Sequence, residues 1–184
     1  LPVPAPVSGT TADAAAALET SHGAKGRVEP VPTDGDYSIF IDYAVTPDAI
    51  ENVLTTLRGI APKRLVMLFG AGGDRDRKKR PIMGKLSADI ADFVIVTSDN
   101  PRTEDPMSII EEILPGVRAG KAPYKVICDR PEAIRWAIDH HEPGDVILLC
   151  GKGHEDYQII GHEKIHMDER EIVADYLAER AKRA

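Results

Sequence analysis

Short apolar runs alternate along the chain with segments of helical character, and this alternation limits the possible folds more than any other feature. The runs lie at residues 38–41, 65–69, 93–97, 125–127 and 146–149. Turn residues bound them, and the stretches between them can hold helices of about ten residues, which is typical of βαβ units. We therefore expect a mostly parallel sheet, whose ligands bind at the edge where the strands end.

Signals for helix starts lie between the apolar runs. Thr46 followed by Pro47 is typical of a helix N-terminus, because threonine caps free N–H groups and proline suits the first turn. Apolar residues then recur every three or four positions, which indicates one buried face. By the same reasoning we expect further helices at residues 81–90, 105–114 and 131–138.

The C-terminal part of the chain departs from the alternation. Residues 157–160 and 163–166 flank Gly161 and His162 and are expected to form a hairpin. A closing helix is expected from about Glu169 onward. The predicted fold class is therefore α/β: a Rossmann-like, mostly parallel sheet flanked by helices, with a C-terminal β-hairpin and a closing helix.

The first residues do not follow the α/β pattern. Residues 1–22 join a Pro- and Val-rich stretch to an alanine-rich one, and Gly23, Gly26 and Pro30 then interrupt the chain. We interpret residues 1–22 as a flexible arm or as the remnant of a preceding central domain. Residues 23–184 are expected to form one domain with a sizeable core.

Composition argues against several classes of function. A net charge of −7 argues against general affinity for nucleic acid or for an anionic membrane. No apolar run approaches the roughly 20 residues of a membrane-spanning helix, and the first residues lack the features of a signal peptide. Cys128 and Cys150 each end an apolar run and are expected to be buried, reduced thiols. We expect a cytoplasmic protein without nucleic-acid or membrane partners.

Polar clusters follow four of the expected strands, at residues 42–47, 70–80, 98–104 and 151–156. Each has a plain explanation when it is taken alone: a tight glycine turn, a solvated charged loop, or turn formers before a proline. The glycines match neither GxGxxG nor the phosphate loop GxxxxGK[ST], so no nucleotide fingerprint is present. Four clusters at one edge of a sheet nevertheless indicate a binding site.

The charges in these clusters suit a zwitterionic, amino-acid-like ligand. Arg75 and Arg102 can each bind a carboxylate through two parallel hydrogen bonds. Backbone N–H groups of residues 151–153 can meet an anion. Side chains that can receive an ammonium group are Asp99, Asn100 and Glu155.

Four motifs occur in an order that resembles one protein family. They are Asp42-Tyr-Ala…Thr-Pro-Asp48, Phe69-Gly-Ala-Gly-Gly-Asp-Arg-Asp76, Asp99-Asn-Pro-Arg102 and Gly151-Lys-Gly-His-Glu-Asp-Tyr-Gln158. Together with Gly26-Arg27, they resemble the C-terminal domain of the Mur ligases, in particular of those that add diaminopimelate to a peptidoglycan precursor. The resemblance covers residues 23–184.

This resemblance implies a reaction and a set of site residues. Members of the family use ATP and Mg²⁺ to join an amino acid to UDP-MurNAc-L-Ala-D-Glu through an acyl phosphate, and the Asp99–Arg102 motif is implied to select meso-diaminopimelate. The residues implied to bind diaminopimelate are Arg75, Asp99, Asn100, Arg102, Gly151 and Glu155, and those implied to lie near the nucleotide are Arg27, Asp42 and Lys78. No catalytic residue and no metal ligand are expected in this chain.

Two departures from the family pattern leave alternatives open. Val45 stands where the family has a histidine near ATP, and valine cannot form the hydrogen bond. Without a phosphate loop, we expect catalysis to need the N-terminal and central ligase domains, and ATP and Mg²⁺ to belong to the complete enzyme. The alternative is a non-catalytic binding module for diaminopimelate-containing cell-wall peptides. A domain selecting lysine is a third possibility, against which Arg102 argues.

Overall fold

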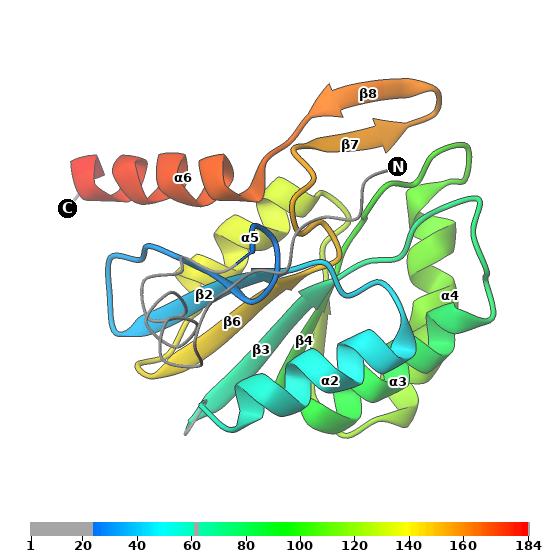
Figure 1. Cartoon of the computed structure of the whole chain (residues 1–184), viewed down its shortest axis with the longest axis horizontal. Coiled ribbons are helices and arrows are strands. Elements are labelled where there is room, and N and C mark those ends of the chain that lie inside the picture. The colour runs from blue at the N-terminus through cyan, green and yellow to red at the C-terminus, as the bar shows by residue number, and fades with distance from the viewer. Residues whose placement is uncertain (1–23, 61–62, 184) are drawn as a thin grey trace, which may run out of the picture.

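The computed structural model describes residues 24–60 and 63–183, which form a six-stranded sheet, helices on both of its faces and a separate hairpin (Figure 1). The sheet strands are β1 (Glu29–Val31), β2 (Tyr37–Asp42), β3 (Arg64–Phe69), β4 (Phe93–Val96), β5 (Tyr124–Val126) and β6 (Asp145–Cys150). They are ordered β1-β2-β6-β3-β4-β5, and every neighbouring pair is parallel except β1 with β2. The hairpin consists of β7 (Tyr157–Ile160) and β8 (Glu163–His166). The predicted fold class is confirmed, whereas the interpretation of residues 1–22 lies outside the described residues.

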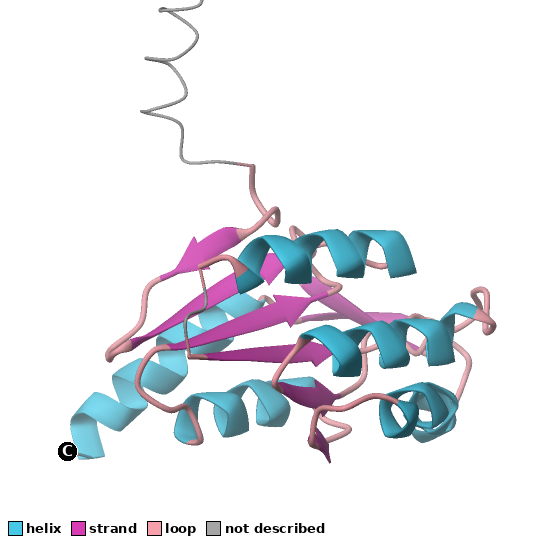
Figure 2. Ribbon diagram, turned by 90° about the horizontal axis from the view of Figure 1, so that it is seen from below, coloured by secondary structure: helices cyan, strands magenta, loops and turns pink. Residues whose placement is uncertain are grey.

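Helices cover both faces of the sheet, as Figure 2 shows. One face packs against α2 (Pro47–Arg58), α3 (Lys79–Ile90) and α4 (Pro106–Ala119). The other face packs against α5 (Arg130–Asp139) and α6 (Glu169–Arg183). In the part of the chain that the structure describes, no helix has the length and apolar character needed to cross a membrane.

The continuous apolar runs follow from burial of the sheet on both faces. In β3, Leu65 and Met67 pack into the core beneath α2–α4, whereas Val66 and Leu68 pack toward α5 and α6. Successive side chains of a strand point to opposite faces, so a strand covered on both sides needs an apolar residue at every position. Cys128 and Cys150 are both free thiols, as predicted; Cys150 is buried in the core beneath α2–α4, whereas Cys128, expected to be buried, is only half-buried.

Helix starts agree with the capping signals in the sequence. Oγ1 of Thr46 accepts a hydrogen bond from the N–H of Ala49 at 3.3 Å. The carboxylates of Asp105 and Asp129 cap α4 and α5 in the same manner. In each of these three helices a proline lies in the first turn. These caps satisfy N–H groups that have no partner within the helix.

Two helix ends differ from the prediction. Helix α3 begins at Lys79 rather than at residue 81, and α4 continues past residue 114, through Pro115, to Ala119. Proline removes one helical hydrogen bond, and α4 nevertheless continues because the residues after it are packed. Val117 is buried, and Gly116 lies so close to α3 that an added Cβ would be 1.8 Å from the carbonyl oxygen of Pro81.

Strand β1 was not predicted. Its three residues pair antiparallel with β2, with Glu29 opposite Ile41 and Val31 opposite Ile39. Pro30 lies in its middle, and proline is tolerated there because β1 is at the edge of the sheet. The strand carries residues 24–28 to the end of the sheet at which the polar clusters lie.

Candidate functional site

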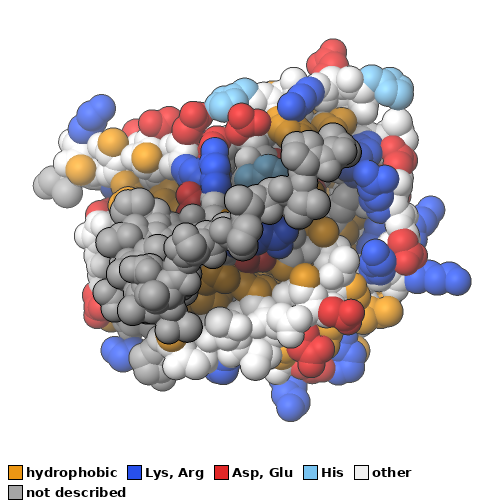
Figure 3. Space-filling view, viewed as in Figure 1, with side chains coloured by type: hydrophobic (Ala, Val, Ile, Leu, Met, Phe, Trp, Pro, Cys, Tyr) orange, Lys and Arg blue, Asp and Glu red, His pale blue; other side chains and the backbone are white. Residues whose placement is uncertain are grey.

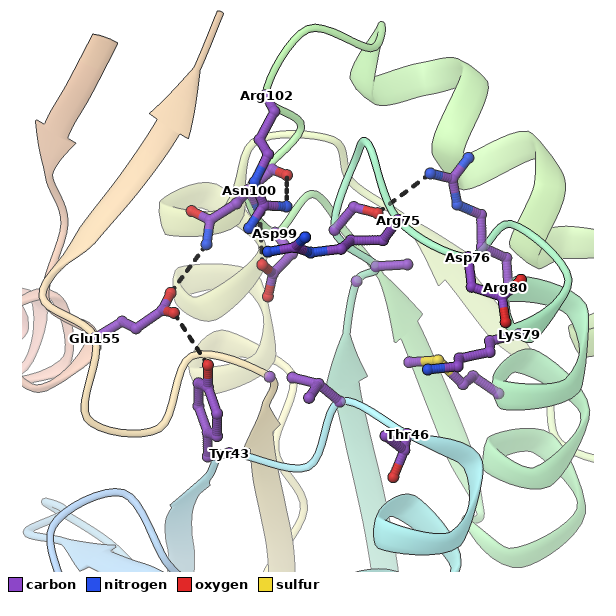
Figure 4. A pocket seen from close by; sticks show the side chains of 16 residues that line it. Tyr43, Thr46, Arg75, Asp76, Lys79, Arg80, Asp99, Asn100, Arg102 and Glu155 are labelled. Atoms are coloured by element: carbon purple, nitrogen blue, oxygen red, sulfur yellow. Dashed lines mark hydrogen bonds between the residues drawn. The ribbon is translucent and has the colours of Figure 1, made fainter. Parts of the chain in front are cut away.

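A cleft of about 270 Å³ lies where the carboxyl ends of the parallel strands meet (Figure 4). The loops after β2, β3, β4 and β6 line it, as the parallel topology predicts. All six residues that the sequence assigns to amino-acid binding line this cleft: Arg75, Asp99, Asn100, Arg102, Gly151 and Glu155. The structure thus brings them together, while their individual roles remain predictions.

The backbone of Arg102 is held in an unusual conformation by the hairpin. Its φ of 52° lies in the left-handed region, which costs free energy for a residue with a Cβ. The N–H of Arg102 donates to the carbonyl of Ile159 at 3.0 Å, and the N–H of Gly161 donates to the carbonyl of Arg102 at 2.6 Å. Its Nη1 donates to the carbonyl oxygen of Gly73 at 2.8 Å. The hairpin and the β3 loop therefore aim the guanidinium at the cleft.

Asn100 is buried and every polar atom of its side chain has a defined neighbour. Its Oδ1 accepts hydrogen bonds from Nζ of Lys152 at 2.8 Å and from the N–H of Ile159 at 2.9 Å. Its Nδ2 donates to Oε2 of Glu155 at 2.9 Å. One N–H of the amide remains for a ligand, because Nδ2 carries two hydrogens.

Asp99 has a carboxylate oxygen without a protein partner. Its Oδ1 accepts a hydrogen bond from the N–H of Asn100 at 2.6 Å. Its Oδ2 is buried and bonds to none of the residues that the structure describes. This oxygen lies beside Gly151, where an added Cβ would be only 2.8 Å away. A buried acceptor without a partner is costly, so Asp99 is suited to receive a donor from a ligand.

Glu155 is the second carboxylate of the cleft, and its environment keeps it ionised. Burial raises the pKa of Glu155, but hydrogen bonds from Lys152 and Asn100 outweigh burial and hold the pKa below its usual value. The hydroxyl of Tyr43 also donates to Oε1 of Glu155, at 3.3 Å. Burial and the charge of Glu155 raise the pKa of Tyr43, so Tyr43 stays a donor at neutral pH.

Arg75 extends across the cleft from the loop after β3, and in Figure 4 its side chain points toward Asp99. Within residues 24–60 and 63–183, no other side chain is hydrogen-bonded to its guanidinium. Arg75 begins a basic segment that ends at Arg80, and Figure 3 shows Lys and Arg side chains gathered on this side of the molecule. Arg75 therefore offers an unengaged carboxylate receptor beside Asp99.

Arg80 lines the cleft, but its guanidinium is bonded to neighbouring protein groups. The side chain is only 1% exposed, and its two terminal nitrogens donate to both carboxylate oxygens of Glu104, at 2.7 and 2.9 Å. It also donates to Glu112 at 2.7 Å and to the carbonyl of Gly72 at 3.2 Å. The loop after β3 is thereby tied to the loop that carries Arg102.

Sequence reasoning missed three residues of this site: Tyr43, Arg80 and Lys152. Lys152 is fully buried, although a lysine between two glycines looks solvent-exposed in sequence. Arg80 lies in a run of basic residues that offers no sign of which one is buried. Tyr43 and Lys152 each lie in one of the four motifs that carry the family resemblance, but no specific role was inferred for either.

The three residues implied to lie near a nucleotide do not line the cleft. Asp42 is buried, and its Oδ2 accepts the N–H of Val28 at 2.9 Å. The guanidinium of Arg27 lies 5.5 Å from the centre of the Tyr43 ring. Lys78 is exposed in the loop before α3. Their role toward a nucleotide remains a prediction. Among the described residues, no group of three His, Cys, Asp or Glu side chains is arranged to hold a metal ion.

The cleft combines receptors of both signs. Arg102 and the free N–H of Asn100 can bind one carboxylate, and Arg75 can bind another. The carboxylates of Asp99 and Glu155 line the same cleft and can receive ammonium groups. These charges suit a small zwitterionic ligand, and the binding of such a ligand stays a prediction.

Comparison with known proteins identifies relatives for most of the chain. Residues 26–153 match the family described as Mur ligase, glutamate ligase domain. A UDP-N-acetylmuramoyl-L-alanyl-D-glutamate–2,6-diaminopimelate ligase of Caldanaerobacter subterraneus subsp. tengcongensis is 54% identical over 158 residues, which are 86% of this chain and 33% of that protein. The ligase of the same name from Trichormus variabilis is 54% identical over 162 residues, 87% of this chain and 32% of that protein.

Solved structures agree with these matches. A structure of a UDP-N-acetylmuramoyl-L-alanyl-D-glutamate–2,6-diaminopimelate ligase is 38% identical, with a TM-score of 0.80 over 90% of this chain and 34% of that chain. A UDP-N-acetylmuramate–alanine ligase of Thermotoga maritima is 22% identical, with a TM-score of 0.60 over 91% of this chain and 32% of that chain, and shares the fold. The chain thus spans about a third of the length of the relatives that it matches.

Proposed function

The chain belongs to the Mur ligase family, and from this membership we propose that it is the amino-acid-recognising C-terminal domain of an ATP-dependent ligase that adds meso-diaminopimelate to UDP-MurNAc-L-Ala-D-Glu. The similarity to diaminopimelate ligases over 86% of the chain supports this assignment. The complete enzyme would comprise this domain, residues 23–184, with N-terminal and central ligase domains. Residues 1–22 would be the end of the central domain.

The observation that carries the proposal is the pairing of Arg102 with Asn100 beside Glu155. Diaminopimelate has an amino-acid group at its far end, with one ammonium and one carboxylate. The carboxylate matches the guanidinium of Arg102 and the free N–H of Asn100, and the ammonium matches Glu155. Lysine has the far ammonium but not the carboxylate, so it would leave Arg102 without its partner. A site built to bond a polar group rejects an analogue that lacks the group.

The other end of the amino acid would lie toward Arg75 and Asp99. Arg75 is free to bind the second carboxylate, and the buried Oδ2 of Asp99 has no partner within the described residues. Recognition at both ends would place the amine that forms the new bond in one position. Holding a reactant in one geometry is itself a large part of catalysis.

The described residues do not by themselves fit ATP or Mg²⁺. Asp42 is already bonded to the N–H of Val28, Val45 offers no hydrogen bond, and no cluster of acidic residues within the described part of the chain can hold a metal. ATP would activate the D-glutamate carboxylate in the complete enzyme, and the groups that hold it would come chiefly from the other domains. Because the reaction consumes ATP, we place the complete enzyme in the cytoplasm.

An NMR titration tests the proposal. The ¹⁵N-labelled chain would be titrated with the diaminopimelate-containing muramoyl tripeptide and, separately, with its lysine counterpart. We expect the first ligand to shift the signals of Asn100, Arg102 and Glu155, and the second to shift them less. The Arg183→Ala variant, which changes an exposed arginine at the end of α6, serves as the matched control. Equal responses to the two peptides would contradict selection of diaminopimelate.

A ligase assay on the complete protein would separate the proposal from its alternative. A non-catalytic module for diaminopimelate-containing peptides would show the same selective shifts. The replacement of the family histidine by Val45 is the observation that favours this alternative. ATP-dependent addition of diaminopimelate by the complete protein would support the ligase, and selective binding without any turnover would support the module.

A further inference from the structure

Lys152 is a buried cation that the proposed binding reaction does not itself use. It is the second residue after β6, between Gly151 and Gly153, and its side chain is 0% exposed. Its ammonium donates to Oδ1 of Asn100 at 2.8 Å and to Oε2 of Glu155 at 2.9 Å. The ring of Tyr157 lies 5.2 Å from Nζ, close enough for a cation–π contact. The charge is therefore fully partnered beneath the cleft, as a buried charge must be.

The contacts of Lys152 determine which end of the Asn100 amide faces a ligand. The oxygen and nitrogen of an asparagine amide have nearly the same shape, so their positions follow from the neighbours. Both neighbours of Oδ1, the ammonium of Lys152 and the N–H of Ile159, are donors. The neighbour of Nδ2 is the carboxylate of Glu155, which is an acceptor. Only one orientation of the amide satisfies all three contacts.

That orientation has a consequence for the ligand. The free N–H of Asn100 is a donor, and the side chains of Asn100 and Arg102 lie next to each other in the wall of the cleft (Figure 4). A reversed amide would present its oxygen there and would repel a carboxylate. The ability of the cleft to prefer a ligand with a carboxylate at this position over a ligand without one thus depends on how firmly the Asn100 amide is held.

We propose that Lys152 is a positioning residue that sets the specificity of the cleft by locking the Asn100 amide with its N–H toward the ligand and by holding Glu155 beside it. The inference rests on the proposed function, because it concerns the preference for diaminopimelate. Lys152 does not contact the ligand in this scheme. It acts through Asn100 and Glu155, which the ligand contacts.

Removing the ammonium weakens the lock on two sides at once. Oδ1 of Asn100 keeps only the N–H of Ile159, and Oε2 of Glu155 keeps only Nδ2 of Asn100. The two remaining contacts favour the same orientation less strongly, so the reversed amide becomes more populated and a bound carboxylate meets an acceptor for a larger part of the time. A ligand without the far carboxylate does not depend on this orientation. The diaminopimelate peptide should therefore lose more affinity than the lysine peptide.

The test compares Lys152→Met with the parent chain and with Lys121→Met, a matched change of an exposed lysine after α4. Two quantities are measured: the side-chain amide signals of Asn100 without ligand, and the ratio of the affinities for the diaminopimelate and lysine tripeptides. We expect Lys152→Met to shift the Asn100 amide signals and to speed their hydrogen exchange. We expect the affinity ratio to fall by roughly tenfold, which corresponds to about 1.4 kcal/mol. Lys121→Met should change neither quantity.

Equal losses of affinity for the two peptides would show that Lys152 is merely structural and would overturn the inference. Unchanged amide signals would overturn it as well. If the methionine variant does not fold, Lys152→Gln decides, because glutamine keeps a donor without the charge. The glutamine variant should reduce the ratio by a smaller factor than tenfold, and an equal loss for both peptides would again refute the positioning role.

The two readouts keep this inference separate from the proposed function. If the parent chain shows no preference for the diaminopimelate peptide, the proposed function fails in the binding assay. In that case the amide signals of Asn100 without ligand still test whether Lys152 holds the amide in one orientation. Signals that move in Lys152→Met but not in Lys121→Met support the lock, and signals that stay in place refute it.

Discussion

Replacing Arg102 tests the proposed preference for diaminopimelate most directly. Nη1 of Arg102 donates to the carbonyl of Gly73 at 2.8 Å, whereas Nε and Nη2 donate to none of the residues 24–60 and 63–183. Those free N–H groups are the ones that would bind the far carboxylate. A hydrogen bond to a charged group contributes about 1.5–3 kcal/mol, so Arg102→Ala should weaken binding of the diaminopimelate tripeptide by roughly 10- to 150-fold.

The lysine tripeptide provides the internal comparison. It has no far carboxylate, so its affinity should change by less than about threefold, a difference of well under 1 kcal/mol. Titration calorimetry or the two NMR titrations described above measure both affinities on the same preparation. Arg183→Ala, at an exposed position of α6, should leave both affinities unchanged. If Arg102→Ala discriminates between the peptides as well as the parent does, the guanidinium is not the group that selects diaminopimelate.

Substituting glycine at residue 102 separates the effect of losing the guanidinium from the effect of the strained backbone. Arg102 has a φ of 52°, and a left-handed residue with a Cβ costs about 1 kcal/mol more than glycine. Arg102→Gly should therefore be more stable than Arg102→Ala by about that amount in urea unfolding, while both lose the preference for diaminopimelate. If the glycine variant is instead the less stable of the two, the interpretation of Arg102 as a strained position is wrong.

Two further predictions concern stability. In Gly73→Ala the new Cβ would lie 1.8 Å from the carbonyl oxygen of Pro101, so the free energy of unfolding should fall by about 3 kcal/mol. In the control Gly161→Ala the Cβ meets open space at a φ of 61°, so the loss should be only about 1 kcal/mol. Similar losses for the two variants in urea unfolding would refute the steric argument. The hydrogen bond from Arg80 lowers the pKa of Glu104 from 4.5 to about 2. Its ionised form therefore stabilises the fold above about pH 4.5, and this contribution is lost as the pH falls toward about 2. Glu104→Gln should flatten that part of the curve of stability against pH, and an unchanged acid limb would contradict the role of this ion pair.

Most of the fold was predictable because its local signals agree with its tertiary structure. The apolar runs, the caps at Thr46 and Asp105, and the turn at Gly161 all favour the elements that form. Strand β1 was not predictable in this way, because its three residues include Pro30 and are defined only by pairing with β2. The end of α4 was missed because Pro115 is a local stop signal that packing of Val117 and Gly116 overrides.

The membership of the cleft was predictable, but the contacts within it were not. Parallel topology brings the ends of β2, β3, β4 and β6 to one edge, so motifs after those strands had to meet. The burial of Lys152 depends instead on its hydrogen bond to Asn100, which follows a different strand of the sheet. Likewise, Arg80 rather than one of its basic neighbours is buried because it forms ion pairs with Glu104 and Glu112. No local pattern records such long-range pairings.

The strand order also governs when this molecule can first exist during its synthesis. The strand β6 is placed between β2 and β3 and pairs with both, although it is the last strand of the sheet along the chain (Figure 1). Until β6 has left the ribosome, β2 and β3 have no common partner, and their apolar edges are open to wrong pairing. Glu155 and the hairpin that holds Arg102 emerge later still. A growing chain therefore has no complete cleft until residues 145–166 have been made, so the centre of the sheet and the cleft both form late in the synthesis of this domain.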